Sequence, residues 1–163
     1  IFPRSSIVLI IAVGITLGDL GGYISLSTPM LVLVWIVAAV WLLLVWFTGY
    51  ILQPGPLKSR LDDVHVAVRH IVTVVLLCVG VYSLVFGGPV ATGWLALKLI
   101  LVAILIAMGS ALRVIVGRWV RDLTGVAGYE GAIARSYPFT RKLAISFWIV
   151  SSSIAFLGVS KFF

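Results

Sequence analysis

The sequence predicts an all-α membrane protein with five transmembrane helices. Three observations support this: an apolar composition, apolar stretches of bilayer length, and basic residues concentrated on one side of the predicted membrane. Of the 163 residues, 62% are hydrophobic and 10% are charged, and the mean hydropathy is +1.23. Soluble domains have about half apolar and a quarter charged residues, so this chain has too few polar groups to cover a water-facing surface. A soluble enzyme, a disordered tail and a disulfide scaffold are therefore excluded.

The first two helices come from the N-terminal third of the chain. A helix needs about 20 apolar residues to cross a hydrocarbon core of ~30 Å. The first such stretch covers about residues 7–25 and is interrupted by Asp19. The uncharged segment that follows is too long for one helix, and Pro29 suits the first turn of a new one. The second helix is therefore expected at about residues 30–52.

Three further helices follow, each bounded by charges or by helix-breaking residues. They are expected at about residues 65–86, 93–120 and 143–160. Backbone groups in lipid must be hydrogen-bonded internally, so each stretch is expected to be helical. Residues 1–163 are then one transmembrane domain with a cytoplasmic loop at 121–142.

The basic residues predict the orientation. The chain carries 12 Lys and Arg against 5 Asp and Glu, and this excess indicates topology rather than a nucleic-acid partner. Ten basic residues fall on the side of the N-terminus, whereas the predicted connections 25–29 and 87–92 carry no charge. Cytoplasmic loops collect Lys and Arg. We therefore expect a cytoplasmic N-terminus and five crossings.

The cytoplasmic loop combines aromatic and basic side chains. The candidate contact residues are Tyr129, Arg135, Tyr137, Arg141 and Lys142. Aromatic and basic residues together suit the headgroup region of an anionic membrane, which predicts bound lipid. The alternative is a docking site for a cytoplasmic partner.

Two ionisable residues lie inside predicted helices, near their outer ends. Asp19 and Lys98 both lie at a depth of roughly 8 Å, at 1.5 Å per residue. Opposite charges at equal depth predict an intramembrane ion pair that locks the first helix to the fourth. The alternatives are that Lys98 extends to the outer surface, or that the two form a polar step in a proton or ion path.

Soft metal ligands are sparse. Cys78 and Met108 lie at comparable depths and could meet in a Cu(I) site if their helices are neighbours, although both residue types also fill apolar interiors. His65 and His70 lie five residues apart at the cytoplasmic end of one helix. This spacing rotates them by roughly 140°, so they do not face one ligand. Either one could still supply an axial ligand to a haem shared with another chain, or be an interfacial histidine.

Small residues predict the helix contacts. The first helix carries Gly14, Gly18 and Gly22 at four-residue spacing, and the fourth and fifth helices carry rows of Ala, Ser and Gly. Such stripes allow close approach of helix backbones in lipid. We expect these three helices to pack together, with the Trp-rich second helix facing lipid or another subunit.

Residues 64–119 contain HVAVRHIVTVVLLCVGVYSLVF followed by GWLALKLILVAILIAMGSALR, with Gly80, Gly93 and Lys98 at characteristic positions. In this pattern the segment resembles the CopD-type family of bacterial inner-membrane proteins. The resemblance implies a bacterial inner membrane location and a role in copper resistance or uptake. It also implies a shared structural role for Lys98. Asp19 stands where the family usually has Trp.

Three functions follow from these observations. The first is an integral accessory or structural subunit of a larger membrane assembly, not itself an enzyme, with the bilayer and other membrane subunits as partners. The second is a CopD-like copper transport or copper-handling protein. The third is an electron-transfer subunit that shares a haem b with another chain.

Overall fold

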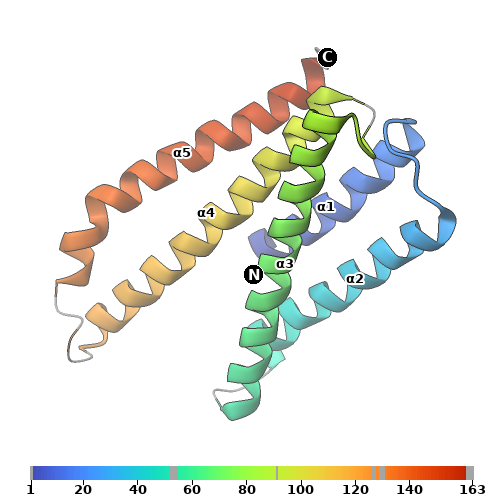
Figure 1. The fold of residues 1–163 in the computed structure, drawn as a ribbon. Helices are drawn as coiled ribbons and strands as arrows, with labels where there is room; N and C mark the ends of the chain where they lie inside the picture. The colour runs from blue at the N-terminus through green and yellow to red at the C-terminus, as the bar shows by residue number, and fades with distance from the viewer. Residues whose placement is uncertain (1, 52–54, 91, 126–127, 129–130, 161–163) are drawn as a thin grey trace.

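The protein is described from a computed structural model, which covers residues 2–51, 55–90, 92–125, 128 and 131–160. These residues form five α-helices: α1 (Phe2–Leu20), α2 (Thr28–Trp46), α3 (Pro56–Phe86), α4 (Gly93–Leu123) and α5 (Ala132–Ser160) (Figure 1). A π-helical segment, η1 (Phe47–Ile51), continues α2. The all-α prediction is confirmed.

Four of these helices are long and apolar enough to cross a membrane. The segments are Thr28–Gly49, Pro56–Phe86, Gly93–Leu123 and Ala132–Ser160. Helix α1 contains a shorter apolar stretch, Ser5–Leu20. The protein is therefore a multi-pass membrane protein, with four candidate spans and a short N-terminal helix. Many large apolar side chains face outward, as expected for helices in contact with lipid.

The helix ends differ from the predicted ones for identifiable reasons. Helix α1 ends at Leu20 rather than near residue 25, because Gly22 adopts a left-handed backbone with φ 72°. Helix α3 begins at Pro56, where proline occupies the first turn. Helices α3 and α4 each have 31 residues, about 46 Å at 1.5 Å per residue. Both therefore extend beyond a hydrocarbon core of ~30 Å.

The packing order differs from the predicted one. Helix α4 lies between α3 and α5, and α1 packs against α2 (Figure 1). Tryptophans of α2 explain the second pairing, because Trp46 Nε1 donates to Ser5 Oγ at 3.2 Å and Trp35 Nε1 donates to Thr16 Oγ1 at 3.1 Å. The predicted contact between the fourth and fifth helices is confirmed, whereas the expectation that the first helix packs with them was wrong, because it packs against the second.

Three apolar clusters hold the helices together. One joins α1 to α2 around Ala12 and Trp41, and another joins α3 to α4 around Leu76 and Ile106. The third lies under the connections 21–27 and 87–92, where Ile24 and Val90 form an isolated antiparallel bridge. The bundle is thus closed at the end that carries the uncharged connections.

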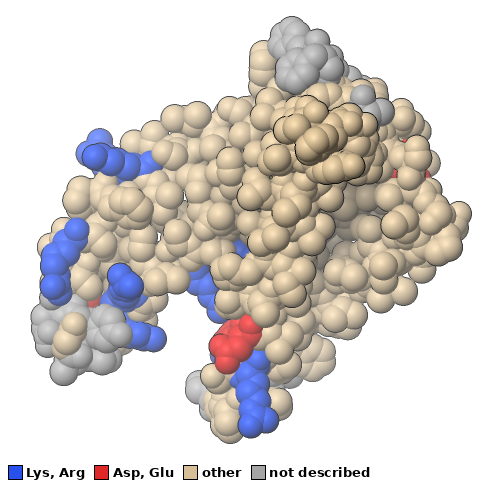
Figure 2. Space-filling view, in the orientation of Figure 1, with Lys and Arg blue, Asp and Glu red and all other residues tan. Residues whose placement is uncertain are grey.

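Charge is distributed unequally between the two ends. Figure 2 shows Lys and Arg side chains where α4 leads into α5 and near the start of α3. Arg113 and Asp62 form an ion pair of 3.1 Å between α4 and α3 at this end. We refer to this end as the basic end.

Candidate functional site

The two predicted intramembrane charges contact different elements. Asp19 Oδ1 accepts the backbone N–H of Leu26 at 2.9 Å and so closes the turn between α1 and α2. Lys98 faces α5, where its Nζ would lie 3.1 Å from a Cβ placed on Gly158. Among the described residues the ion pair is Arg113–Asp62, and the predicted Asp19–Lys98 pair does not form. The cause is that the turn backbone occupies the carboxylate and Lys98 is on the α5-facing side of α4.

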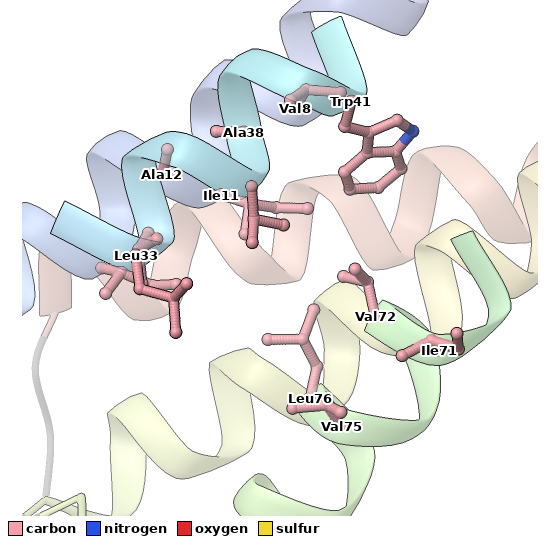
Figure 3. A pocket seen from close by; sticks show the side chains of 13 residues that line it. Val8, Ile11, Ala12, Leu33, Ala38, Trp41, Ile71, Val72, Val75 and Leu76 are labelled. Atoms are coloured by element: carbon pink, nitrogen blue, oxygen red, sulfur yellow. The ribbon is translucent and has the colours of Figure 1, made fainter. Parts of the chain in front are cut away.

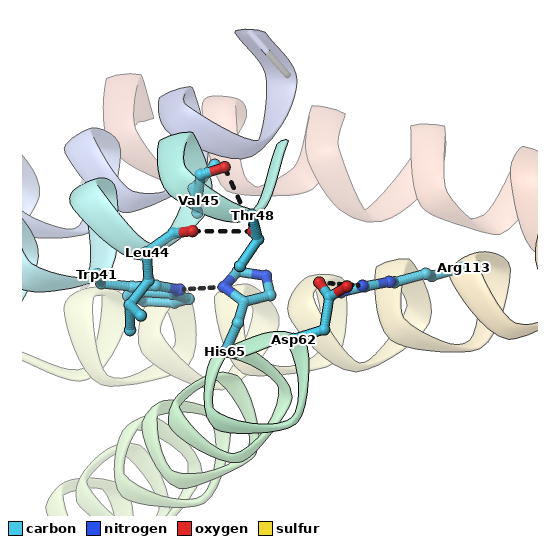
Figure 4. A network of polar contacts seen from close by, with 7 residues as sticks. All are labelled: Trp41, Leu44, Val45, Thr48, Asp62, His65 and Arg113. Atoms are coloured by element: carbon cyan, nitrogen blue, oxygen red, sulfur yellow. Dashed lines mark hydrogen bonds and ion pairs between the residues drawn. The ribbon is translucent and has the colours of Figure 1, made fainter. Parts of the chain in front are cut away.

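His65 is buried between α2 and α3. Its side chain is 5% exposed, and Trp41 Nε1 donates to its Nδ1 at 3.1 Å (Figure 4). Indole N–H is a donor only, so Nδ1 must be unprotonated. Close by, Thr48 Oγ1 donates to the carbonyl oxygen of Leu44 at 2.8 Å. Trp41 and His65 are 24 residues apart in the chain, and no sequence pattern predicts their contact.

His70 differs in both exposure and hydrogen bonding. It is exposed on α3, and its Nδ1 lies 2.7 Å from the carbonyl oxygen of Val66. A carbonyl only accepts, so Nδ1 carries the proton and the Nε2 lone pair is the one available to a ligand. Metal-ligating histidines are commonly oriented by a bond of this kind.

Cys78 and Met108 do not meet. Two contacts define the register of α3 against α4. A Cβ on Gly80 would lie 2.9 Å from the carbonyl oxygen of Ala96. The guanidinium of Arg69 donates to the carbonyl oxygen of Ile106 at 3.0 Å. This register places Met108 beside Arg69, about 13 Å from Cys78 along α3 at 1.5 Å per residue. Cys78 is also exposed. The expectation of equal depth was wrong, and no group of three or more His, Cys, Asp or Glu that could hold a metal occurs among the described residues.

The predicted cytoplasmic loop is largely helical. Arg135, Tyr137, Arg141 and Lys142 lie in the first turns of α5 and are exposed, and Tyr129 lies outside the described residues.

Asp122 explains why the helix begins so early. Its Oδ1 accepts the N–H of Gly131 at 3.1 Å, and its Oδ2 accepts that of Ile133 at 3.0 Å. A carboxylate at a helix N-terminus satisfies free N–H groups and interacts favourably with the helix dipole. The α4–α5 connection is therefore short and the basic residues extend along α5.

Two grooves were not foreseen from the sequence. The first, which we name the apolar groove, has a volume of about 440 Å³ and lies between α1, α2 and α3 (Figure 3). Its lining includes Ala12, Leu33, Ala38, Ile71, Val75 and Leu76. The second, which we name the α3–α4 groove, has a volume of about 760 Å³ and lies at the basic end. Its lining includes Asp62, Arg69, His70, Arg113, Gly117 and Arg118.

Comparison of the chain with protein-family models, with curated proteins and with solved structures finds no match. The resemblance to the CopD-type family therefore stays a prediction, and the geometry of this chain is the basis for its function.

Proposed function

We propose that the protein is an integral, non-catalytic subunit of a larger membrane assembly, and that the apolar groove receives a transmembrane helix of a neighbouring subunit. The observation that carries the proposal is the groove itself, a space of about 440 Å³ lined by side chains such as Ala38, Leu33 and Val75. All the residues along its walls are hydrophobic (Figure 3).

The groove has the features of a helix-binding surface. Its floor includes Ala12 and Ala38, which are 1% and 8% exposed, and its rims include Leu33 and Ile71, which are 58% and 62% exposed. Small residues on the floor let a neighbouring helix approach closely, and association in lipid depends on such packing. Large apolar rims add contact area on both sides of that helix.

We further propose that α1 crosses the bilayer, which gives five crossings and a cytoplasmic basic end. Helix α1 has 19 residues, about 28 Å at 1.5 Å per residue, close to the hydrocarbon thickness. Ser5 and Trp46 join α1 to α2 at one end, and the α1–α2 turn meets the α3–α4 connection through Ile24 and Val90 at the other. The positive-inside rule then orients the basic end toward the cytoplasm.

The subunit proposal is tested by filling the groove without changing charge. Val37 lines the groove and is 44% exposed, whereas Val40 is 53% exposed on the same helix and does not line it. Tagged Val37→Trp and Val40→Trp chains are purified in mild detergent from the native membrane. A second membrane chain in fixed stoichiometry, lost with V37W and retained with V40W, is the expected result.

A photo-crosslinking residue at Leu33 provides an independent readout. The expected product is an adduct with the same second chain. Purification of the wild-type chain without any stoichiometric partner, together with crosslinks from Leu33 to lipid alone, would contradict the proposal.

One observation favours a second function, electron transfer through a haem b shared with another chain. The Nδ1 proton of His70 is donated to Val66, so Nε2 is available as an axial ligand on an exposed face of α3. The second axial ligand would come from the neighbouring subunit. A Soret band in the purified assembly that disappears in His70→Ala is expected, and an assembly without this band would contradict a haem role.

Copper handling, which the CopD resemblance implies, remains a third proposal with weaker support. The separation of Cys78 from Met108 leaves no paired soft site for it. The copper-handling proposal would be supported by stoichiometric copper in the purified chain that is reduced in Cys78→Ser or Met108→Leu.

A further inference from the structure

The α3–α4 groove lies where the two helices diverge. Helices α3 and α4 are in contact along much of their length and separate toward the basic end (Figure 1). Close to where they separate, Arg69 donates to the carbonyl oxygen of Ile106 at 3.0 Å. Its Nη2 would lie 2.6 Å from a Cβ on Gly109, so a side chain at that position would displace the end of the Arg69 side chain. The whole groove has a volume of about 760 Å³ and is lined from Arg69 toward Asp62 and Arg121.

The charges along the groove are predominantly positive. Four arginines line it, Arg69, Arg113, Arg118 and Arg121, against the two aspartates Asp62 and Asp63. Asp62 is already paired with Arg113 at 3.1 Å. The other lining residues include the hydroxyl of Ser110 and the imidazole of His70. The groove therefore carries an excess of positive charge together with hydrogen-bond donors.

Two arginines have unused donors. Arg113 Nη1 is buried and has no hydrogen-bond partner among the described residues, although Nη2 of the same guanidinium bonds Asp62. Arg118 is exposed, and no hydrogen bond joins its side chain to another described residue. Buried donors without an acceptor cost free energy, and guanidinium groups match the oxygen geometry of phosphate.

The lining of the groove also includes apolar side chains from both helices. These are Val66 of α3 and Ala107 and Ala111 of α4. A ligand that fits both surfaces has an anionic head and an apolar tail.

We infer that the α3–α4 groove binds the phosphodiester headgroup of an anionic phospholipid, with arginines of α4 on the phosphate and the acyl chains along the apolar wall. Basic pockets between transmembrane helices at the cytoplasmic side are suited to such headgroups. This site is separate from the apolar groove and does not depend on the subunit proposal.

The test uses the full chain in detergent, titrated with phosphatidylglycerol or phosphatidylcholine and followed by native mass spectrometry. Phosphatidylglycerol is expected to bind more tightly. Arg118→Gln is expected to weaken its binding about fivefold, the effect of one basic residue near a lipid surface. The matched control is Arg141→Gln, which removes the same charge from an exposed position on α5 outside the groove and is expected to bind like wild type.

A second variant distinguishes lipid binding in the groove from attraction of the lipid by diffuse surface charge. Gly117 lines the groove, and a Cβ placed on it meets nothing within 4 Å, so Gly117→Leu begins its side chain in open space and adds bulk to the groove without changing charge. It is expected to reduce phosphatidylglycerol binding without lowering the thermal unfolding temperature.

Three outcomes would overturn the inference. Equal losses in R118Q and R141Q, with G117L unchanged, would show that diffuse charge alone attracts the lipid. Equal binding of the two lipids would remove the selectivity for an anionic headgroup. Displacement of phosphatidylglycerol by inorganic phosphate at a similar concentration would identify a site for the free anion.

Discussion

Indole N–H groups join neighbouring helices at several points in this protein. In hydrocarbon an indole donor needs an acceptor, and side chains of neighbouring helices supply it here. The four pairs seen in the described residues link α1 to α2 twice, α2 to α3, and α4 to α5: Trp46–Ser5, Trp35–Thr16, Trp41–His65 and Trp119–Ser136. Polar side chains in this apolar chain thus stabilise particular helix pairs.

The Trp41–His65 pair predicts a contribution to stability. Trp41→Phe keeps the aromatic volume and removes the donor to His65 Nδ1, so it is expected to lower the free energy of unfolding by about 1 kcal/mol. Thermal unfolding in detergent is expected to show a lower unfolding temperature for W41F than for wild type. Equal unfolding temperatures would contradict the assigned hydrogen bond.

The closest approach of α3 to α4 depends on Gly80. A Cβ there would lie 2.7 Å from Ile100 Cγ1 and 2.9 Å from the carbonyl oxygen of Ala96. Gly80→Ala must therefore separate the helices, and a loss of about 1–3 kcal/mol is expected from such overpacking. Gly117→Ala is the control, because that position is open and alanine favours a helix by up to about 1 kcal/mol. Equal unfolding temperatures for G80A and wild type would contradict the packing described.

At the scale of elements, turns and caps determine where the helices end. Asp19 closes the α1–α2 turn and Asp122 caps α5, so two of the acidic residues of the chain bond backbone N–H groups. Both act locally in the structure, whereas the sequence analysis placed Asp19 in a contact between distant helices.

The role of Asp19 in the turn predicts different effects for two substitutions. Asp19→Asn keeps the side-chain oxygen that accepts from Leu26, and its unfolding temperature is expected to stay close to that of wild type. Asp19→Ala leaves that N–H without its acceptor and is expected to cost about 1 kcal/mol. Equal losses in both variants, measured by thermal unfolding, would show that the negative charge itself matters and would favour the ion-pair or ion-path interpretation.

At the scale of the whole molecule, the unequal charge of the two ends predicts which side of the membrane each connection faces. Single cysteines at Ser27, Ser59 and Ser5 in a Cys78→Ser background probe both ends of the bundle. Ser27→Cys is expected to react with a membrane-impermeant maleimide from outside. Ser59→Cys and Ser5→Cys are expected to react only after permeabilisation, because basic connections stay in the cytoplasm. Reaction of S5C from outside would show that α1 does not cross.

Composition and spacing alone determined that the chain is a multi-pass all-α membrane protein with basic residues gathered at one end. The physical reason is that only segments whose backbone is hydrogen-bonded internally are stable in hydrocarbon. The length of the apolar segments and the positions of the charges are therefore sufficient to predict the membrane-spanning helices and the basic end. Which helices are neighbours, and in what register, depends on how each helix is rotated and at what angle it crosses the next. The sequence pattern is compatible with several such packings. Four features therefore follow only from the tertiary structure. These are the packing of α1 against α2, the separation of Cys78 from Met108, the hydrogen bond between Trp41 and His65, and the groove where α3 and α4 diverge.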